Sequence, residues 1–134
     1  MVILDTNIII DHLRQSPGRK TLLKELVKKY NEHNLVISVV TIQEIYEGKS
    51  TKDKENEEKF LSTISHLKTL SYTFEIAQLA GQIARDFDKP IDFADAAIAS
   101  TAIINDCELA TRNIKDFKGI KNLQFAELST LPLQ

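Results

Sequence analysis

Apolar runs and helical spacings alternate along this chain, and together they predict an ordered series of strands and helices. Short apolar runs predict buried strands at residues 2–4, 35–39, 108–111 and 123–125, with a further short strand around 70–72. Apolar residues at helical spacing predict helices at residues 6–13, 22–30, 41–47, 60–70, 74–87 and 92–104. Short strands that alternate with longer helices are typical of the α/β class, in which helices cover both faces of a central parallel sheet.

Two of the predicted helices have a special place in this picture. The helix at residues 92–104 is apolar on nearly every side after its first turn, so we expect it at the centre of the fold. A second helix carries an apolar stripe that needs a cover, and a second subunit is one candidate for that cover. The stripe consists of Phe60, Leu61, Ile64, Leu67 and Leu70. We therefore predict a homodimer.

Length and composition predict a single soluble domain over residues 1–134. The 43% of hydrophobic and 27% of charged residues are ordinary for a globular protein. No apolar run approaches the roughly 18 residues that a membrane span requires, so no membrane partner is expected. The first residues read as a core strand instead of an export leader, and the single cysteine, Cys107, cannot form an internal disulfide. These features predict a cytoplasmic protein.

The net charge of −2 offers no overall cationic field to a nucleic acid or an acidic membrane. The local distribution is less uniform, because basic residues gather at 14–29 and again at 112–121. Each cluster has two interpretations that the residues leave open. It is either the solvated face of a surface helix or a surface that meets phosphate groups.

Several acidic residues occupy equivalent places after the predicted strands. Asp5 follows the first strand directly, and Glu44 lies one turn into the helix after the second strand. Asp95 lies in the first turn of the apolar helix, and Asp116 follows the strand that ends at Thr111. Because the carboxyl ends of parallel strands meet at one edge of a sheet, we expect these carboxylates to approach one another.

Helix capping is the alternative interpretation of these acids. Thr41 and Glu44 fit a capping box, in which the two side chains satisfy backbone amides at a helix start. Asp92 is a natural N-cap with Asp95 three residues later, and Asp5 is positioned to cap the helix that begins after it. Taken singly, each acid fits a cap well.

The expected grouping of several acids at one edge of the sheet favours a metal site over separate helix caps. Asp5 and Asp95 are flanked by the most apolar segments of the chain, and buried carboxylates near one another take up protons unless a cation compensates their charge. Oxygen ligands with room for water indicate Mg²⁺, with Mn²⁺ as the second choice. The histidines match no zinc spacing; they are His12, His33 and His66.

Four motifs in this order resemble the PIN-domain family, and the closest type is the VapC-like toxin ribonuclease of toxin–antitoxin pairs. The motifs are ILDTN at residues 3–7, SVVTIQE at 38–44, IDFADAAIA at 91–99 and ATRN at 110–113. The resemblance runs from Leu4 to Phe117. It implies a PIN-like fold and a Mg²⁺-dependent endoribonuclease that is usually dimeric and is inhibited by a cognate antitoxin protein.

The resemblance also implies roles for individual residues. Asp5 and Asp95 would be the principal metal ligands, with Glu44 as the third acid and either Asn113 or Asp116 completing the catalytic set. Neutral hydrogen bonds around these acids would come from Thr6, Asn7, Thr111 and Asn113. The RNA backbone would meet the basic clusters, with Arg14, Arg112 and Lys115 as the candidates.

Two other functions compete with the ribonuclease hypothesis. One is a Mg²⁺-dependent phosphohydrolase that forms an aspartyl-phosphate on Asp5, although that class has a second acid where this chain has Asn7. The other is a non-catalytic PIN-like regulatory domain that retains the pocket. The presence of every acid that the mechanism requires favours catalysis.

Overall fold

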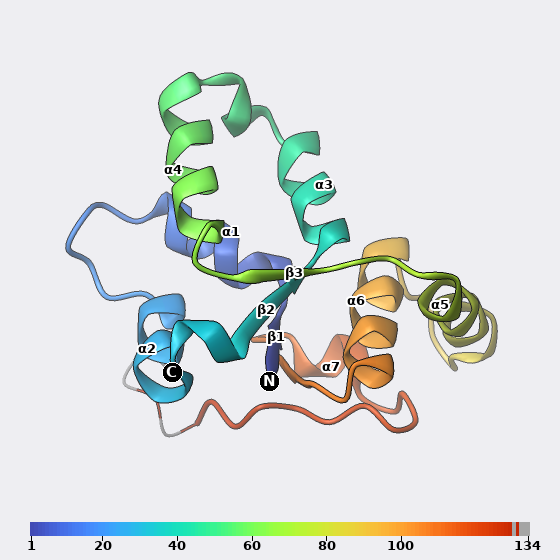
Figure 1. The fold of residues 1–134 in the computed structure, drawn as a ribbon. Helices are drawn as coiled ribbons and strands as arrows, with labels where there is room; N and C mark the ends of the chain where they lie inside the picture. The colour runs from blue at the N-terminus through green and yellow to red at the C-terminus, as the bar shows by residue number, and fades with distance from the viewer. Residues whose placement is uncertain (130, 132–134) are drawn as a thin grey trace.

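A parallel sheet forms the middle layer of the protein (Figure 1). The computed structural model describes residues 1–129 and 131. Within these residues the sheet has four strands in the order β3-β2-β1-β4, and all neighbouring pairs are parallel. The strands are β1 (Val2–Leu4), β2 (Leu35–Ser38), β3 (Lys68–Leu70) and β4 (Glu108–Ala110). The predicted α/β class with a central parallel sheet is confirmed.

The two faces of the sheet bury different side chains because successive residues of a strand point to opposite sides. Leu4 and Ile37 belong to one hydrophobic core, whereas Ile3, Val36 and Leu109 belong to the other. Burial on both faces explains why β1 and β2 read as continuous apolar runs instead of alternating polar and apolar positions.

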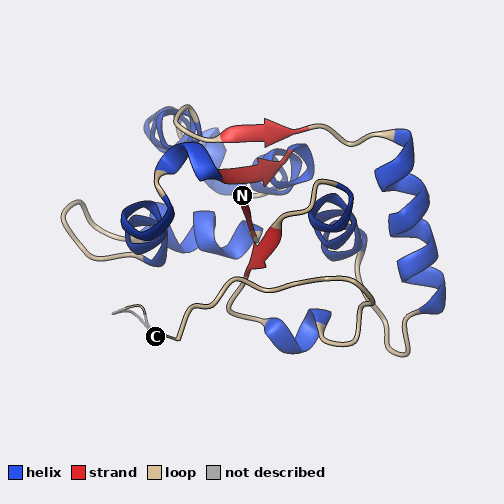
Figure 2. Ribbon diagram, turned by 60° about the horizontal axis from the view of Figure 1, so that its bottom comes forward, coloured by secondary structure: helices blue, strands red, loops and turns tan. Residues whose placement is uncertain are grey.

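Helices cover the sheet on both sides (Figures 1 and 2). One face is covered by α1 (Thr6–Arg14), α2 (Leu22–Tyr30) and α4 (Lys54–Ile64). The other face is covered by α6 (Phe93–Ile104) and α7 (Ile114–Phe117), and α5 (Phe74–Asp86) packs on α6. The helix α3 (Val39–Glu47) leaves the end of β2 and contacts both α1 and α6. Short 3₁₀ turns, η1 (Glu32–Asn34) and η2 (Lys49–Lys52), complete the connections.

The helix α6 is buried as its sequence predicts. Every residue from Ala96 to Ala102 is buried, and the small side chains on this helix let its neighbours approach closely. The Ser100 hydroxyl donates a hydrogen bond to the carbonyl oxygen of Ile76 at 2.7 Å, which ties α6 to α5. This packing fixes the start of α6, and with it Asp95, relative to the sheet.

Four predicted elements differ clearly from the structure. The helix predicted at residues 60–70 ends at Ile64, and the chain then forms β3 at 68–70, slightly before the predicted position. Residues 123–125 form an isolated parallel bridge between Phe125 and Leu109 instead of a strand. The helix predicted from Thr41 begins at Val39. In each case tertiary contacts set the boundary that local periodicity left open.

The apolar stripe is covered by the protein's own core, so the reason given above for a second subunit is wrong. The Phe60 side chain is fully buried, and Ile64 and Leu67 pack against the same core. Leu61 remains exposed, and Leu70 belongs to β3. Separately, no helix in the described part of the chain is long and apolar enough to cross a membrane.

Candidate metal-binding site

Asp5 lies where β1 ends at the carboxyl edge of the sheet. Its side chain is only 4% exposed, and its backbone amide donates to the carbonyl oxygen of Ala110 at 2.9 Å. The Thr111 hydroxyl donates a hydrogen bond to Asp5 Oδ2 at 2.8 Å, and the Asn113 amide in turn donates to that hydroxyl at 3.0 Å. Asp5 occupies the N-cap position of α1 without a side-chain cap bond, so the capping interpretation is wrong for this residue.

Glu44 faces the same edge from α3. The Thr6 hydroxyl donates to Glu44 Oε1 at 2.5 Å and lies 2.8 Å from the Thr41 hydroxyl. Because a hydroxyl carries one proton, Thr41 must donate to Thr6 while Thr6 donates to Glu44. The cap of α3 is Ser38, whose hydroxyl accepts from the Val40 amide at 3.0 Å. The capping box predicted for Thr41 and Glu44 is therefore wrong.

Asp92 and Asp95 stand at the start of α6. The Asp95 amide donates to Asp92 Oδ1 at 2.8 Å, so Asp92 is the N-cap that the sequence predicts. Asp95 is half-buried in the first turn of the helix. The side-chain oxygen of Asp92 accepts from the backbone, whereas no hydrogen bond or ion pair to the Asp95 carboxylate is found among the described residues.

Burial and mutual repulsion raise the proton affinity of these acids. Burial raises the pKa of Asp5 and of Glu44, although hydrogen bonds from Thr111 and Thr6 oppose the effect. The pKa of Asp95 rises to about 7, first through burial and then through the charges of the neighbouring acids. Those acids are Asp92, Asp5, Glu44 and Asp116, in decreasing order of effect. Carboxylates from four separate parts of the chain therefore share one electrostatic field.

The acids share this field without forming a closed cage. Within residues 1–129 and 131, no three Asp, Glu, His or Cys side chains are arranged to hold a metal ion together. The donor chemistry nevertheless fits a hard cation. Mg²⁺ is commonly bound through one or two carboxylates, with water and substrate phosphate completing its coordination. Asp5 and Asp95 would be those carboxylates, with Glu44 close enough to raise the pKa of Asp95.

The predicted supporting residues divide into two groups. Thr6 and Thr111 are buried and hold Glu44 and Asp5 directly. Asn7 is exposed in the first turn of α1, and Asn113 contributes its backbone amide to Thr111. Asn113 and Asp116, the two candidates for the fourth position, differ in charge and in contacts. Asp116 is exposed in α7, and its charge raises the pKa of both Asp5 and Asp95.

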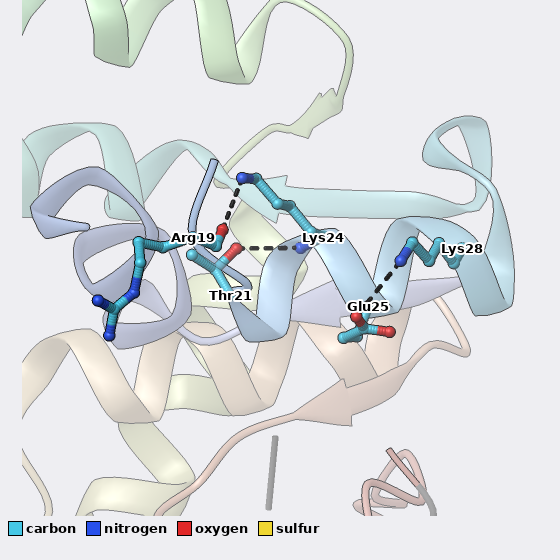
Figure 3. Close-up of polar contacts among 5 residues, drawn as sticks. All are labelled: Arg19, Thr21, Lys24, Glu25 and Lys28. Carbon is cyan, nitrogen blue, oxygen red and sulfur yellow. Dashed lines mark hydrogen bonds and ion pairs between the residues drawn. The ribbon is translucent and has the colours of Figure 1, made fainter. Parts of the chain in front are cut away.

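The first basic cluster is split by the fold. The helix α2 leads toward the start of β2, so Lys28 and Lys29 lie toward the edge of the sheet opposite the acids. Figure 3 shows how this helix uses its cations locally. Lys24 Nζ donates to the Arg19 carbonyl oxygen at 2.6 Å, and Lys28 Nζ lies 3.5 Å from Glu25 Oε1. These contacts support the solvated-surface interpretation for residues 19–29.

The other predicted cations lie elsewhere. Arg14 ends α1 and lines a cavity that also includes Glu44. Arg112 Nη1 lies 3.3 Å from Asp11 Oδ2 across exposed side chains, close in sequence to Thr111. Lys115 is exposed in α7, and its carbonyl oxygen accepts a hydrogen bond from Lys89.

Sequence reasoning missed two contributions to this site. Thr41 was interpreted as a helix cap, yet it is fully buried and orients Thr6 toward Glu44. Asp92 was interpreted only as a cap, yet its charge also raises the pKa of Asp5, Glu44 and Asp95. The position of Asp92 three residues before Asp95 was the available signal, because both side chains then flank one helix start.

Comparison with known proteins identifies the family and the fold. The family model described as PIN domain matches residues 2–123. This chain belongs to the PIN-domain family. The PIN domain is 34% identical over 127 residues to ribonuclease VapC19 of Mycobacterium tuberculosis, an alignment that covers 92% of this chain and 98% of that protein.

Solved structures agree with this family assignment. The PIN domain matches a chain of a toxin–antitoxin complex from Klebsiella pneumoniae with a TM-score of 0.74 and 26% identity, covering 96% of this chain and 100% of that chain. It matches DNA-bound VapBC from Salmonella typhimurium with a TM-score of 0.80 and 26% identity, covering 93% and 96% of the two chains. The arrangement of sheet and helices is thus shared with VapC-type proteins.

Proposed function

We propose that this PIN domain is a Mg²⁺-dependent endoribonuclease and the toxin of a toxin–antitoxin pair. The observation that carries the proposal is the group of mutually repelling carboxylates at the carboxyl edge of the sheet, in which the pKa of Asp95 reaches about 7. Such a group keeps its charges at neutral pH most readily when a cation is bound among them. The similarity to ribonuclease VapC19 supports RNA as the substrate.

The residues of this chain have distinct parts in the proposed reaction. Asp5, held by Thr111, and Asp95, at the start of α6, are the proposed metal ligands. Glu44, held by Thr6, and Asp116 add negative charge around them. Asp5 and Asp95 would hold Mg²⁺, or alternatively Mn²⁺, which when bound would supply charge neutralisation for the phosphodiester and activation of water for hydrolysis.

The competing functions have less support in the structure. An aspartyl-phosphate enzyme needs an accessible carboxylate nucleophile, whereas Asp5 is 4% exposed and accepts a hydrogen bond from Thr111. Asn7, at the position where that class carries its second acid, is neutral. A non-catalytic domain has no need for a buried Asp5 with half-buried Glu44 and Asp95 that repel it, because their charges cost folding free energy.

A cleavage assay tests the proposed activity. The purified protein should cut RNA when Mg²⁺ is present and stop when the metal is chelated, and Asp5→Asn should lose most of this activity. Asp86→Asn is the matched control, because Asp86 is an exposed acid paired with Arg85 in another part of the surface. Equal cleavage by wild type and Asp5→Asn would contradict the proposal.

A cognate antitoxin protein is the proposed partner, supported by the structural match to a toxin–antitoxin complex. Co-expression with the product of an adjacent reading frame should yield a stable complex with reduced nuclease activity. Failure of the two proteins to copurify would contradict this pairing. A cytoplasmic location accompanies this proposal, because cellular RNA is the substrate.

The homodimer also remains a proposal, now on different grounds. Phe74 and Phe93 are 82% and 69% exposed, and Tyr72 lies beside Phe93 with ring centroids 6.0 Å apart. Large exposed aromatic side chains are typical of protein interfaces. Sedimentation should show a dimer at micromolar concentration that Phe74→Ser together with Phe93→Ser converts to a monomer. A monomeric wild-type protein would contradict the homodimer.

A further inference from the structure

A cavity of about 440 Å³ is lined in part by Glu44. Its walls come from α1, α3, η2 and α4. Figure 1 shows α3 and α4 as two neighbouring arms joined through η2, with α1 next to them. Because Glu44 lines this cavity and also shares the field of Asp5 and Asp95, the cavity adjoins the proposed cleavage site.

The apolar part of the cavity lining belongs to the hydrophobic core. Ile45 and Phe60 are buried, and Ile10 and Leu13 pack against the same core. The Phe60 ring is held edge-on by Tyr46 at a centroid distance of 5.8 Å. A nucleobase can therefore reach the half-buried Ile10 and Leu13, which are supported by the core that contains Ile45 and Phe60.

The remainder of the lining is mostly polar, and three of its four charged residues are cations. Arg14, Lys49 and Lys59 contribute positive charge against the single carboxylate of Glu44, although the whole chain carries −2. Lys59 Nζ donates to the carbonyl oxygens of Leu13 and Gln15 at 3.0 and 3.2 Å, so Lys59 holds the end of α1. Arg14 and Lys49 are exposed at the rim, where an anionic group can reach them.

We propose that this cavity binds one nucleotide of the RNA strand next to the bond that is cut. The base lies against the apolar lining, and its phosphate contacts Arg14 and Lys49. The volume is within the range of about 300–1,000 Å³ in which small-molecule sites fall. This proposal rests on the ribonuclease function proposed above, and it makes the cavity a subsite for a nucleotide flanking the acids.

Nucleotide titration followed by methyl NMR tests the subsite directly and needs no catalytic activity. The probes are the four ribonucleoside 5′-monophosphates, with inorganic phosphate as the comparison. The methyl signals of Ile10, Leu13 and Ile45 should shift saturably with at least one nucleotide, while those of Ile120, in the other core, should stay in place. Unmoved cavity methyls would overturn the proposal, and equal shifts with inorganic phosphate would do so as well.

Salt-dependent RNA binding provides a second test. Arg14→Ala combined with Lys49→Ala, made in an Asp5→Asn background, should reduce the slope of log affinity against log salt for a single-stranded oligoribonucleotide by about 0.7, because the two cations neutralise one phosphate. Lys68→Ala, on the exposed edge strand β3, is the control and should leave the slope unchanged.

The two proposals fail in different ways. If wild type cleaves RNA and the double alanine variant keeps both the salt slope and KM, the subsite is wrong while the ribonuclease function stands. If wild type cleaves no RNA but nucleotides shift the cavity methyls, the subsite stands as a nucleotide site and the ribonuclease function is wrong.

Discussion

Threonine hydroxyls orient two of the acids in this protein. Thr111 donates to Asp5 and Thr6 donates to Glu44, and in both pairs the donor comes from a different element than the acid. A hydrogen bond to a carboxylate favours its charged form, whereas burial favours its protonated form. These acids are therefore fixed in place while their proton affinity stays raised.

Thr111→Val should destabilise the protein by about 1–3 kcal/mol at pH 8, because the buried Asp5 carboxylate loses a charge-assisted hydrogen bond. The loss should shrink toward pH 4 as Asp5 takes up a proton. The comparison variant is Thr101→Val, which removes a neutral bond to Ala97 within α6 and should show no such pH dependence. Urea unfolding measures both variants, and an identical loss at both pH values for Thr111→Val would contradict this account.

Asp95→Asn should stabilise the protein above pH 7 in the absence of divalent metal. The folded pKa of about 7 exceeds the ordinary value of 3.8, so the folded state binds this proton more tightly than the unfolded state. The resulting stability is present below about pH 4 and is lost as the pH rises to about 7. Removing the Asp95 charge should increase the free energy of unfolding by about 1–2 kcal/mol at pH 8. This is less than the full pKa shift implies, because solvent screens the charge of a half-buried group.

Urea unfolding at pH 4 and pH 8 checks this expectation. The two proteins should have similar stability at pH 4 and diverge as the pH rises. Asp86 is the matched control, because its pKa shifts in the opposite direction to that of Asp95. A hydrogen bond from Arg85 lowers the pKa of Asp86. Asp86→Asn should therefore show no gain at pH 8. A loss of stability in Asp95→Asn at pH 8 would contradict the repulsion described here.

The beginning of α6 is the element that brings two of the acids to the site. Asp92 ends the preceding loop and caps the helix, and the apolar body of α6 is anchored in the core behind it. A cap fixes the first turn of a helix, so the backbone around Asp95 is held at both ends. The same side chain stabilises α6 through its cap bond and raises the pKa of Asp95 through its charge.

Replacing Asp92 separates these two effects. Asp92→Ala and Asp92→Ser both remove the charge, but only Asp92→Ser keeps a capping oxygen, so the alanine variant should be about 1 kcal/mol less stable than the serine variant. The serine variant should therefore match or exceed wild-type stability at pH 8 without metal. Thr73→Ala, which removes the cap bond to Ile76 at the start of α5, provides a cap loss without a change of charge. Denaturant midpoints compare the three variants. A serine variant that is clearly less stable than wild type at pH 8 would contradict a role for the charge, and equal losses in Asp92→Ala and Asp92→Ser would contradict a role for the cap.

Parallel topology assembles the site at the scale of the whole molecule. Asp5 and Thr111 are 106 residues apart in sequence, yet β1 and β4 are neighbours and end at the same edge. Glu44 reaches that edge through β2, on the other side of β1. The two hydrophobic cores hold the helices against the sheet, so the positions of the acids depend on the packing of the entire chain.

Divalent metal should stabilise the whole protein in a pH-dependent way if the proposed ligands bind it. At a hundredfold excess over Kd, Mg²⁺ should add about 2.7 kcal/mol and raise Tm by several degrees. The increase should be larger at pH 8 than at pH 5, because Asp95 must release its proton to bind the ion. Thermal unfolding with and without Mg²⁺ measures the shift. An undiminished shift in Asp95→Asn would contradict the assignment of Asp95 as a ligand.

The sequence by itself determined the class of the fold and most of its elements. Continuous apolar runs can be buried only as central strands, and the apolar helix at 92–104 can be stable only inside the fold. It also indicated that Asp5, Glu44 and Asp95 would meet, because each follows a strand or opens a helix at the same edge. The N-cap Asp92 was predictable because its hydrogen bond is local.

Only the tertiary structure decided which competing hydrogen bonds form. Thr41 and Glu44 fit a local capping box equally well, but α3 begins two residues earlier and Thr6 arrives from α1 to bind both side chains. Likewise, the stripe around Phe60 is covered by the protein's own core instead of a partner. Local periodicity specifies which face of an element is apolar, whereas the partner of that face depends on how distant elements pack.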